Sequence, residues 1–177
     1  GLSGSLNLYA KWSPITYTIT YELNGGEHNL ENPIEYTEDA EDIVLQAPTR
    51  NGYEFLGWYA DSEFGFPDNI IEKGSQGELV FYAKWARKYN IKYELNGGSN
   101  NEKNPATYNA ESEVILENPA KKGYRFDGWY SDSSFKNKVM GIEYGTTGTK
   151  IFYAKWTKQK YTITYSLNGG KLSSSNP

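Results

Sequence analysis

The chain contains one histidine and no cysteine, so it has few side chains of the kinds that serve as general bases, thiol nucleophiles or zinc ligands. His28 follows Gly25-Gly26 in a loop, and a second copy of that loop has Asn100 at the corresponding position. A catalytic base in a repeated unit should recur. The Asn-Gly-Gly runs also lack the Lys-Ser/Thr that completes a phosphate-binding loop. We therefore interpret His28 as a loop residue exposed to solvent, and we predict neither enzymatic activity nor a cofactor.

Two aspartates recur shortly after a Trp-Tyr pair, Asp61 and Asp132, and a carboxylate there could bind Ca²⁺. A calcium loop needs several oxygen ligands close together, and these loops do not supply them in the sequence. We favour a turn in which the Asp side chain bonds to the backbone that follows it. The more acidic run 38–42 has only Glu111 and Glu113 as its counterpart, which indicates a solvated loop. No metal site is predicted.

The Trp-Tyr pairs themselves are candidates for ligand contact. Strict alternation would place Trp58 on the sheet face opposite Tyr53 and Phe55. In one interpretation Gly57 marks a β-bulge that returns the Trp to the core, and Gly128 does the same in the second copy. In the other, the aromatic rings form a stacking surface for a sugar or a protein. The core interpretation is favoured, and the residues that would contact a ligand are Trp58, Tyr59, Trp129 and Tyr130.

A covalent cross-link is a further alternative for a chain without disulfides. Lys84, Asn24 and Glu22 could form a Lys–Asn isopeptide bond beside an acidic group, and all three residue types recur in the second copy. A tight turn already explains the Asn, and an outward strand face explains the Lys. We therefore disfavour the cross-link.

These residues are positioned by an internal repeat, which dominates the sequence. YTITYELNGG at 17–26 returns at 89–98 and 161–170, and GYEFLGWY at 52–59 returns at 123–130. The block YAKW ends at Trp12, Trp85 and Trp156, and Asn-Pro occurs at 32–33, 104–105 and 176–177. We predict a C-terminal strand of a preceding repeat at 1–12, complete repeats at 17–85 and 89–156 joined by a linker at 86–88, and the N-terminal hairpin of a following repeat at 161–177.

Period-two alternation predicts that each repeat is built of strands. Tyr17, Ile19, Tyr21 and Leu23 share one face of the opening strand, and Asn24-Gly25-Gly26 supplies the positive φ angles of a tight turn. Phe81, Ala83 and Trp85 share one face of the closing strand, with Tyr82 and Lys84 on the other. The patterns at 60–74 and 131–145 are weaker and fit an irregular loop or a helical turn.

Charge and hydropathy exclude other classes of protein. A pI of about 5.1 provides no basic footprint for nucleic acid, and no stretch approaches the roughly 18 apolar residues of a membrane helix. The first repeat has 14 acidic and 3 basic residues, a net charge of −11, whereas the second has 8 and 9, a net of +1. The surface therefore varies while the framework recurs.

In the order and spacing of these blocks, the chain resembles the Listeria–Bacteroides repeat, also described as the internalin B-type B repeat. The resemblance implies a β-rich α+β fold of tandem small β-grasp-like repeats with little helix. It implies a non-catalytic, extracellular stalk or spacer in a bacterial cell-surface protein of the adhesin or internalin type, attached to the cell wall or outer membrane through regions outside this chain. The alternative is an adhesive module that recognises a glycan or host protein through aromatic and acidic surfaces. The expected partners are neighbouring repeats of the same protein.

The ends of the chain carry incomplete repeats, so we expect a fragment of a longer protein. An unpaired strand edge invites pairing. We predict that residues 1–12 or 161–177 pair with a neighbouring unit or with another copy of the chain.

Overall fold

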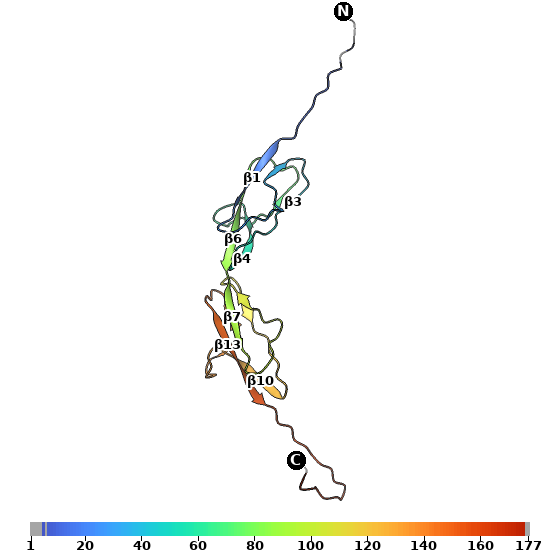
Figure 1. The fold of residues 1–177 in the computed structure, drawn as a ribbon, viewed down its shortest axis with the longest axis vertical. Coiled ribbons are helices and arrows are strands. Elements are labelled where there is room, and N and C mark those ends of the chain that lie inside the picture. The colour runs from blue at the N-terminus through green and yellow to red at the C-terminus, as the bar shows by residue number, and fades with distance from the viewer. Residues whose placement is uncertain (1–4, 6, 176–177) are drawn as a thin grey trace, which may run out of the picture. The chain divides into compact units, whose positions relative to one another are not determined.

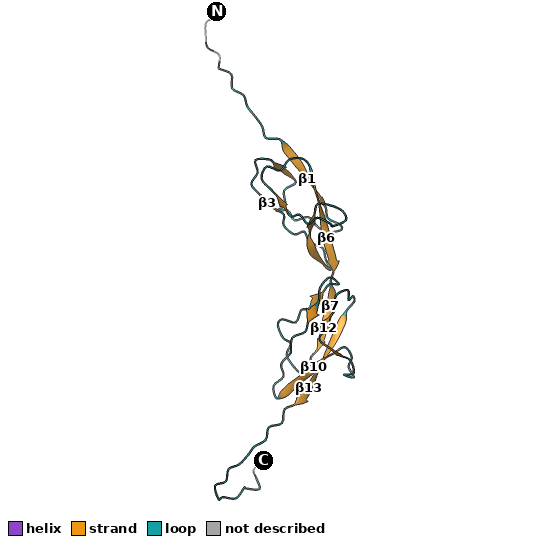
Figure 2. Cartoon of the chain, turned by 180° about the vertical axis from the view of Figure 1, so that it is seen from behind, coloured by secondary structure: helices purple, strands orange, loops and turns teal. Residues whose placement is uncertain are grey.

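The computed structural model describes residue 5 and residues 7–175, and it divides the chain into two compact units, residues 1–88 and 89–177. The described residues form strands, turns and loops, with no helix (Figures 1 and 2). The β-rich prediction is therefore confirmed. The loops at 60–74 and 131–145, where a helical turn was one option, contain only turns, short strands and bridges.

The first unit is built on a four-stranded sheet in the order β2-β1-β6-β4. Figure 1 labels three of these strands, β1, β6 and β4. The first strand β1 and the last strand β6 are parallel neighbours, with Ile19 level with Leu79 and Tyr21 level with Phe81. A small two-stranded sheet pairs β3 with β5. The strands are β1 (Thr16–Glu22), β2 (Glu35–Thr37), β3 (Ile43–Val44), β4 (Tyr53–Tyr59), β5 (Ile70–Ile71) and β6 (Leu79–Arg87).

The second unit repeats this arrangement in the order β11-β10-β13-β7-β8, again with its first and last long strands, β7 and β13, parallel and adjacent. Its added strand β11 corresponds to the single bridge between Tyr59 and Pro67 in the first unit. The strands are β7 (Tyr89–Glu94), β8 (Thr107–Tyr108), β9 (Val114–Ile115), β10 (Tyr124–Tyr130), β11 (Lys138–Val139), β12 (Gly141–Ile142) and β13 (Lys150–Lys158).

The Asn-Gly-Gly turn has the backbone that its sequence predicts. Asn24 and Gly25 have φ angles of 49° and 84°, and Asn96 and Gly97 repeat them at 49° and 81°. The following glycine is required for a different reason: a Cβ on Gly26 would lie 2.5 Å from Cζ2 of Trp85. The indole of Trp85 in turn donates to the carbonyl of Leu23 at 2.9 Å, so the closing strand holds the opening turn.

The bulge interpretation of the Trp-Tyr pairs is confirmed. The pairing of β4 with β6 shifts register between Phe55 and Gly57, Gly57 has a φ of 139°, and the same shift occurs at Gly128. Trp58 and Trp129 therefore turn into the core, where they are 1% and 2% exposed. The alternative in which these two indoles contact a ligand at the surface is wrong.

Each Trp is anchored by a buried Asn of the Asn-Pro motif. The backbone carbonyl of Gln46 accepts hydrogen bonds from Trp58 Nε1 at 3.0 Å and from Asn32 Nδ2 at 2.9 Å, while the Gln46 N–H donates to Asn32 Oδ1 at 2.6 Å. In the second unit Glu117, Trp129 and Asn104 repeat the arrangement. The third Asn-Pro, at 176–177, lies outside the described residues.

The boundaries differ from prediction in two places. Residues 86–88 are not a free linker: β6 continues to Arg87, Ala86 is buried opposite Glu54, and the Lys88 N–H donates to Gly52. Residues 7–15 and 159–175 form no strand and are exposed, so within this chain the predicted pairing of the terminal segments with a neighbouring unit is wrong. Pairing between copies stays a prediction. Residues 1–4 and 6 of the first terminal segment lie outside the described residues.

Candidate functional site

The solvent-facing side of each main sheet carries a row of three recurring side chains. Glu22 on β1 is level with Tyr82 on β6, and Tyr82 is level with Tyr59 on β4. These side chains face away from the core because Phe81 and Ala83, which alternate with Tyr82, are buried. In the second unit the same row is Glu94, Tyr153 and Tyr130.

A loop adds a second aromatic ring to this row, and a lysine lies over both rings. The Phe64 ring packs edge-on against Tyr59 with centroids 5.4 Å apart, and Lys84 Nζ lies 5.3 Å and 5.7 Å from the two centroids. Phe135, Tyr130 and Lys155 repeat the group, with the rings 5.5 Å apart and the ammonium 5.2 Å and 5.6 Å from them. We call these residues the outer-face patch: Glu22, Tyr82, Tyr59, Phe64 and Lys84, and their counterparts Glu94, Tyr153, Tyr130, Phe135 and Lys155.

The Phe of each patch has an unusual backbone. Phe64 and Phe135 have φ angles of 58° and 56°, a left-handed conformation that costs a bulky residue about 1–3 kcal/mol. Asp61 stabilises it by accepting hydrogen bonds from the N–H groups of Glu63, Gly65 and Phe66. The favoured turn interpretation of Asp61 and Asp132 is thus confirmed.

These hydrogen bonds lower the pKa of both carboxyl groups. The Ser134 hydroxyl, followed by the Asn137 and Lys136 N–H groups, lowers the pKa of Asp132 to about 2. The pKa of Asp61 is lowered chiefly by the Gly65 N–H and then by that of Phe66. Each aspartate therefore acts as a charged acceptor that holds the Phe loop over the sheet.

A shallow groove borders the outer-face patch in both units, with a volume of about 490 Å³ in the first and 530 Å³ in the second. Nine lining positions correspond one for one between the two grooves, and Tyr124 also lines the groove of the second unit. Beyond patch residues it is lined by Asn24, Arg50, Ser62, Ala83 and Trp85, or by Asn96, Lys121, Ser133, Ala154 and Trp156. Each groove therefore has two basic side chains: Arg50 and Lys84 in the first unit, Lys121 and Lys155 in the second. Lys121 Nζ is fixed by a 2.6 Å hydrogen bond to the Asn96 carbonyl.

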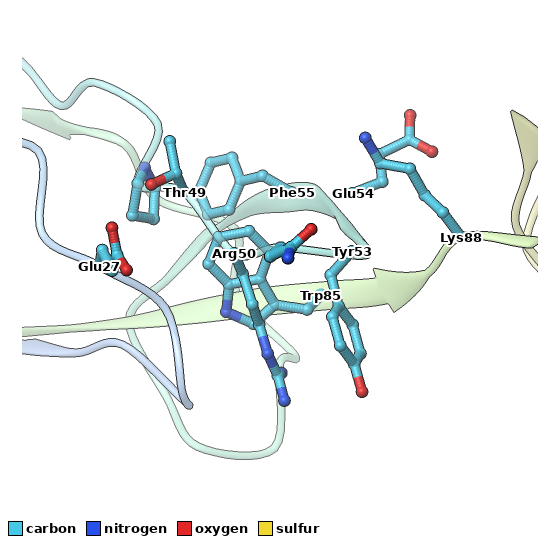
Figure 3. Close-up of a pocket in the computed structure, with 10 residues that line it drawn as sticks. Glu27, Thr49, Arg50, Tyr53, Glu54, Phe55, Trp85 and Lys88 are labelled. Carbon is cyan, nitrogen blue, oxygen red and sulfur yellow. The ribbon is translucent and has the colours of Figure 1, made fainter.

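A second hollow of about 470 Å³ in the first unit lies at the end of the β4–β6 pair. In Figure 3, Phe55 and Trp85 form its aromatic part, and Arg50 and Tyr53 point in the same direction, the guanidinium carbon 3.7 Å from the Tyr53 centroid. Its polar residues Glu27, Glu54 and Lys88 are replaced in the second repeat by Ser99, Arg125 and Gln159. The polar lining of this hollow is therefore not repeated in the second unit, whereas the groove beside the outer-face patch has matching residues in both.

The sequence predicted only part of this surface. Tyr59 and Tyr130 lie in the outer-face patch, whereas Trp58 and Trp129 lie beneath the sheet. The recurring Phe, the outward Tyr and Lys of YAKW, and the basic pair at Arg50 and Lys121 were missed as site residues. The available signal was their return at a fixed spacing on positions that alternation assigns to solvent.

Two further candidates have structural explanations. His28 packs against Tyr21, with ring centroids 4.8 Å apart, and its Nε2 lies 3.4 Å from the Asn32 carbonyl. Asn24 uses its amide group to donate to the Ala83 carbonyl at 2.9 Å, and Glu22 is exposed to solvent, so the geometry gives no support to an isopeptide bond. Across the described part of the chain, no three His, Asp or Glu side chains are grouped to hold a metal ion.

The comparisons with known proteins agree with the repeat architecture. Residues 17–84 and 89–155 each match the Listeria-Bacteroides repeat domain. The chain belongs to the Listeria–Bacteroides repeat family. No solved structure is significantly similar to it.

Relatives of this Listeria–Bacteroides repeat chain are longer proteins. It is 32% identical over 174 residues to a protein from Evansella cellulosilytica that is named as a Gly-rich membrane protein. The aligned region covers 96% of this chain and 19% of the relative. A second protein of that organism, named as a membrane protein, is 31% identical over 94% of this chain and 25% of its own length. Internalin H of Listeria monocytogenes is 28% identical over 82% of this chain and 26% of its own length.

The chain therefore spans about a fifth to a quarter of the length of these relatives. Within the described residues, no helix is long and apolar enough to cross a membrane.

Proposed function

We propose that this chain is a non-catalytic, extracellular spacer in a bacterial cell-surface protein, where it separates a functional domain from the cell. Support for the surface location comes from relatives that are named membrane proteins and an internalin. We also propose that each unit is a helix-free variant of the β-grasp fold. The mixed sheet, with its first and last long strands parallel at the centre, supports that assignment.

The observation that carries the spacer proposal is the parallel pairing of β1 with β6 and of β7 with β13. Because the first and last strands of a unit run in the same direction side by side, the chain enters at one end of the sheet and leaves at the other. Thr16 lies three residues before the level of Leu79, and Arg87 lies eight residues after it. At about 3.3 Å per residue, the first unit advances the chain by roughly 36 Å.

The same geometry determines how a unit bears load. Tension applied through its two ends slides β1 and β6 along each other and loads all the hydrogen bonds between them together. Each unit also has its own aromatic core. We therefore expect a repeat of this kind to transmit force while folded.

Single-molecule force spectroscopy on residues 1–177 tests this proposal. Two unfolding events are expected. Each should lengthen the chain by roughly 210 Å, because about 72 residues reach roughly 250 Å when extended and about 36 Å is already spanned. A single event of twice that length would mean that the units are not separate spacers, and lengthening without a force peak would mean that they do not bear load.

An adhesive role for the same surface is the second candidate, and the recurrence of the outer-face patch favours it. Tyr59 and Tyr130 are the two predicted contact residues that remain at the surface in this proposal. Its specific form is developed below.

A further inference from the structure

The first unit places its few basic residues in an unexpected location. Its repeat at residues 17–85 has 14 acidic residues and only three basic ones, Arg50, Lys73 and Lys84. Two of these three, Arg50 and Lys84, line the groove beside the outer-face patch. Lys73 lies elsewhere, in an exposed ion pair with Glu41 at 2.7 Å.

The second unit has a very different net charge, but its groove has basic side chains at the two corresponding positions, Lys121 and Lys155. Each groove has one carboxylate among its lining residues, Glu22 or Glu94, against two basic side chains, so the lining itself has a net charge of +1. In the second unit Lys155 also interacts with the carboxylate of Asp127, outside the lining. The net charge of the whole repeat changes by twelve units, from −11 at 17–85 to +1 at 89–156, and the charge pattern of the groove lining does not change.

The other groove residues suit a sugar ring. Tyr82 and Phe64 present half-buried aromatic rings, on which the C–H face of a sugar can stack. Glu22, Asn24 and Ser62 are exposed and supply oxygen acceptors and hydroxyl or amide donors for sugar hydroxyl groups. Lys84 is held over Tyr59 and Phe64 and so is already positioned when a ligand arrives.

We propose that the groove of each unit binds an anionic saccharide, with the two basic side chains holding its carboxylate or sulfate group and Tyr82 or Tyr153 packing against its ring. This goes beyond the spacer role, because a spacer requires no ligand. A groove of about 500 Å³ has the size of a small-ligand site. An extended polyanion such as nucleic acid would be repelled by the net charge of −11 on the first repeat, so a short acidic sugar is the better match.

Isothermal titration calorimetry of the whole chain tests the proposal in about 0.15 M salt, where exposed charges are screened. The probes are trigalacturonate, a chondroitin sulfate tetrasaccharide, and the neutral trisaccharide cellotriose. The first two distinguish carboxylate from sulfate recognition. At least one of them is expected to bind with a Kd on the order of 1 mM or lower, and cellotriose is expected to bind at least about tenfold more weakly.

Two pairs of substitutions separate the cations from the aromatic surface. K84Q/K155Q should weaken binding by about tenfold or more, because it removes a charge-assisted contact in each unit. Y82S/Y153S keeps every charge and should weaken binding by at least about fivefold, since stacking is lost. The matched control K73Q/K103Q removes the same amount of charge from exposed positions elsewhere and should stay within about twofold of the wild type.

Circular dichroism and thermal melting establish that each variant is folded, and R50Q/K121Q provides a second cation test if K84Q/K155Q is not. The proposal is overturned if neither anionic probe binds the wild type, or if cellotriose binds equally well. It is also overturned if the control pair weakens binding as much as a groove pair, since that result would mean nonspecific attraction between opposite charges.

Discussion

Replacement of Trp58 by Ala should strongly destabilise the first unit and leave the stability of the second one unchanged. The Trp58 side chain is 1% exposed and packs against Tyr21 and Phe55, with ring centroids 5.3 Å and 5.5 Å away. Truncation of a buried Trp to Ala costs about 3–5 kcal/mol through lost burial and the cavity that remains. A unit of about 70 residues has a stability of roughly 4–10 kcal/mol in total, so the loss removes a large part of it or all of it.

Trp58→Phe separates packing from hydrogen bonding at this position. It keeps an aromatic ring in the core but loses the indole N–H that donates to Gln46. The Gln46 carbonyl still accepts from Asn32 Nδ2 at 2.9 Å and is not left without a partner. The expected cost is therefore only about 1–2 kcal/mol, from one hydrogen bond and a small loss of volume.

Urea denaturation followed by tryptophan fluorescence and near-ultraviolet circular dichroism measures both effects. W58A should show an early transition for the first unit, and the unchanged transition of the second unit provides an internal reference. Tyr59→Ala, on the opposite side of the sheet, should cost no more than about 1 kcal/mol. If W58A costs less than about 1 kcal/mol, or less than Y59A, then Trp58 is not a core residue and the bulge argument fails.

Three further predictions concern polar groups. Asn32→Leu should destabilise the first unit by about 2–5 kcal/mol in the same urea assay, because the Gln46 N–H loses its partner in a buried place; a cost below about 1 kcal/mol would contradict this. Burial raises the pKa of Tyr21 and Tyr93 from 10.0 to about 12, so their contribution to stability is present below pH 10 and is lost as the pH rises through 12. Absorbance at 295 nm should show a class of tyrosines that ionises late. Uniform tyrosine ionisation near pH 10 with the fold intact would contradict this prediction. Hydrogen bonds lower the pKa of Asp132 from 3.8 to about 2, so its contribution to stability is present above pH 3.8 and is lost as the pH falls through 2. Carbon NMR of the Asp132 carboxyl group should show a titration midpoint near 2. A midpoint near 3.8 would show that the loop hydrogen bonds do not form in solution.

The sequence predicted the repeat and much of each strand, because both depend on short-range patterns. Alternation alone assigned Ile19 and Phe81 to the core, and the Asn-Gly-Gly run specified its positive φ angles at Asn24 and Gly25. These features are set by neighbours a few residues apart, so one chain contains enough information to predict them.

The remainder depends on contacts between distant residues. The continuation of β6 to Arg87 is stabilised by pairing with Tyr53, more than thirty positions earlier, so spacing near residues 86–88 did not reveal it. The outer-face patch is assembled from β1, β4, β6 and a loop whose Phe adopts a left-handed conformation that alternation cannot predict. The only sequence signal for the patch was that its residues recur at a fixed spacing. Because the core and turn residues recur at the same spacing, this signal did not distinguish the patch from them.

The most direct test of the spacer account is replacement of residues 17–156 in a parent protein that carries them. One variant deletes both units, and another replaces them with two unrelated folded domains that each advance the chain by the same distance, roughly 36 Å. The account predicts that deletion impairs the action of the domain that the spacer presents, and that the unrelated domains restore it. Failure of the unrelated domains to restore activity, with the protein correctly displayed on the cell, would contradict a spacer role and assign the function to the surfaces of the repeats themselves.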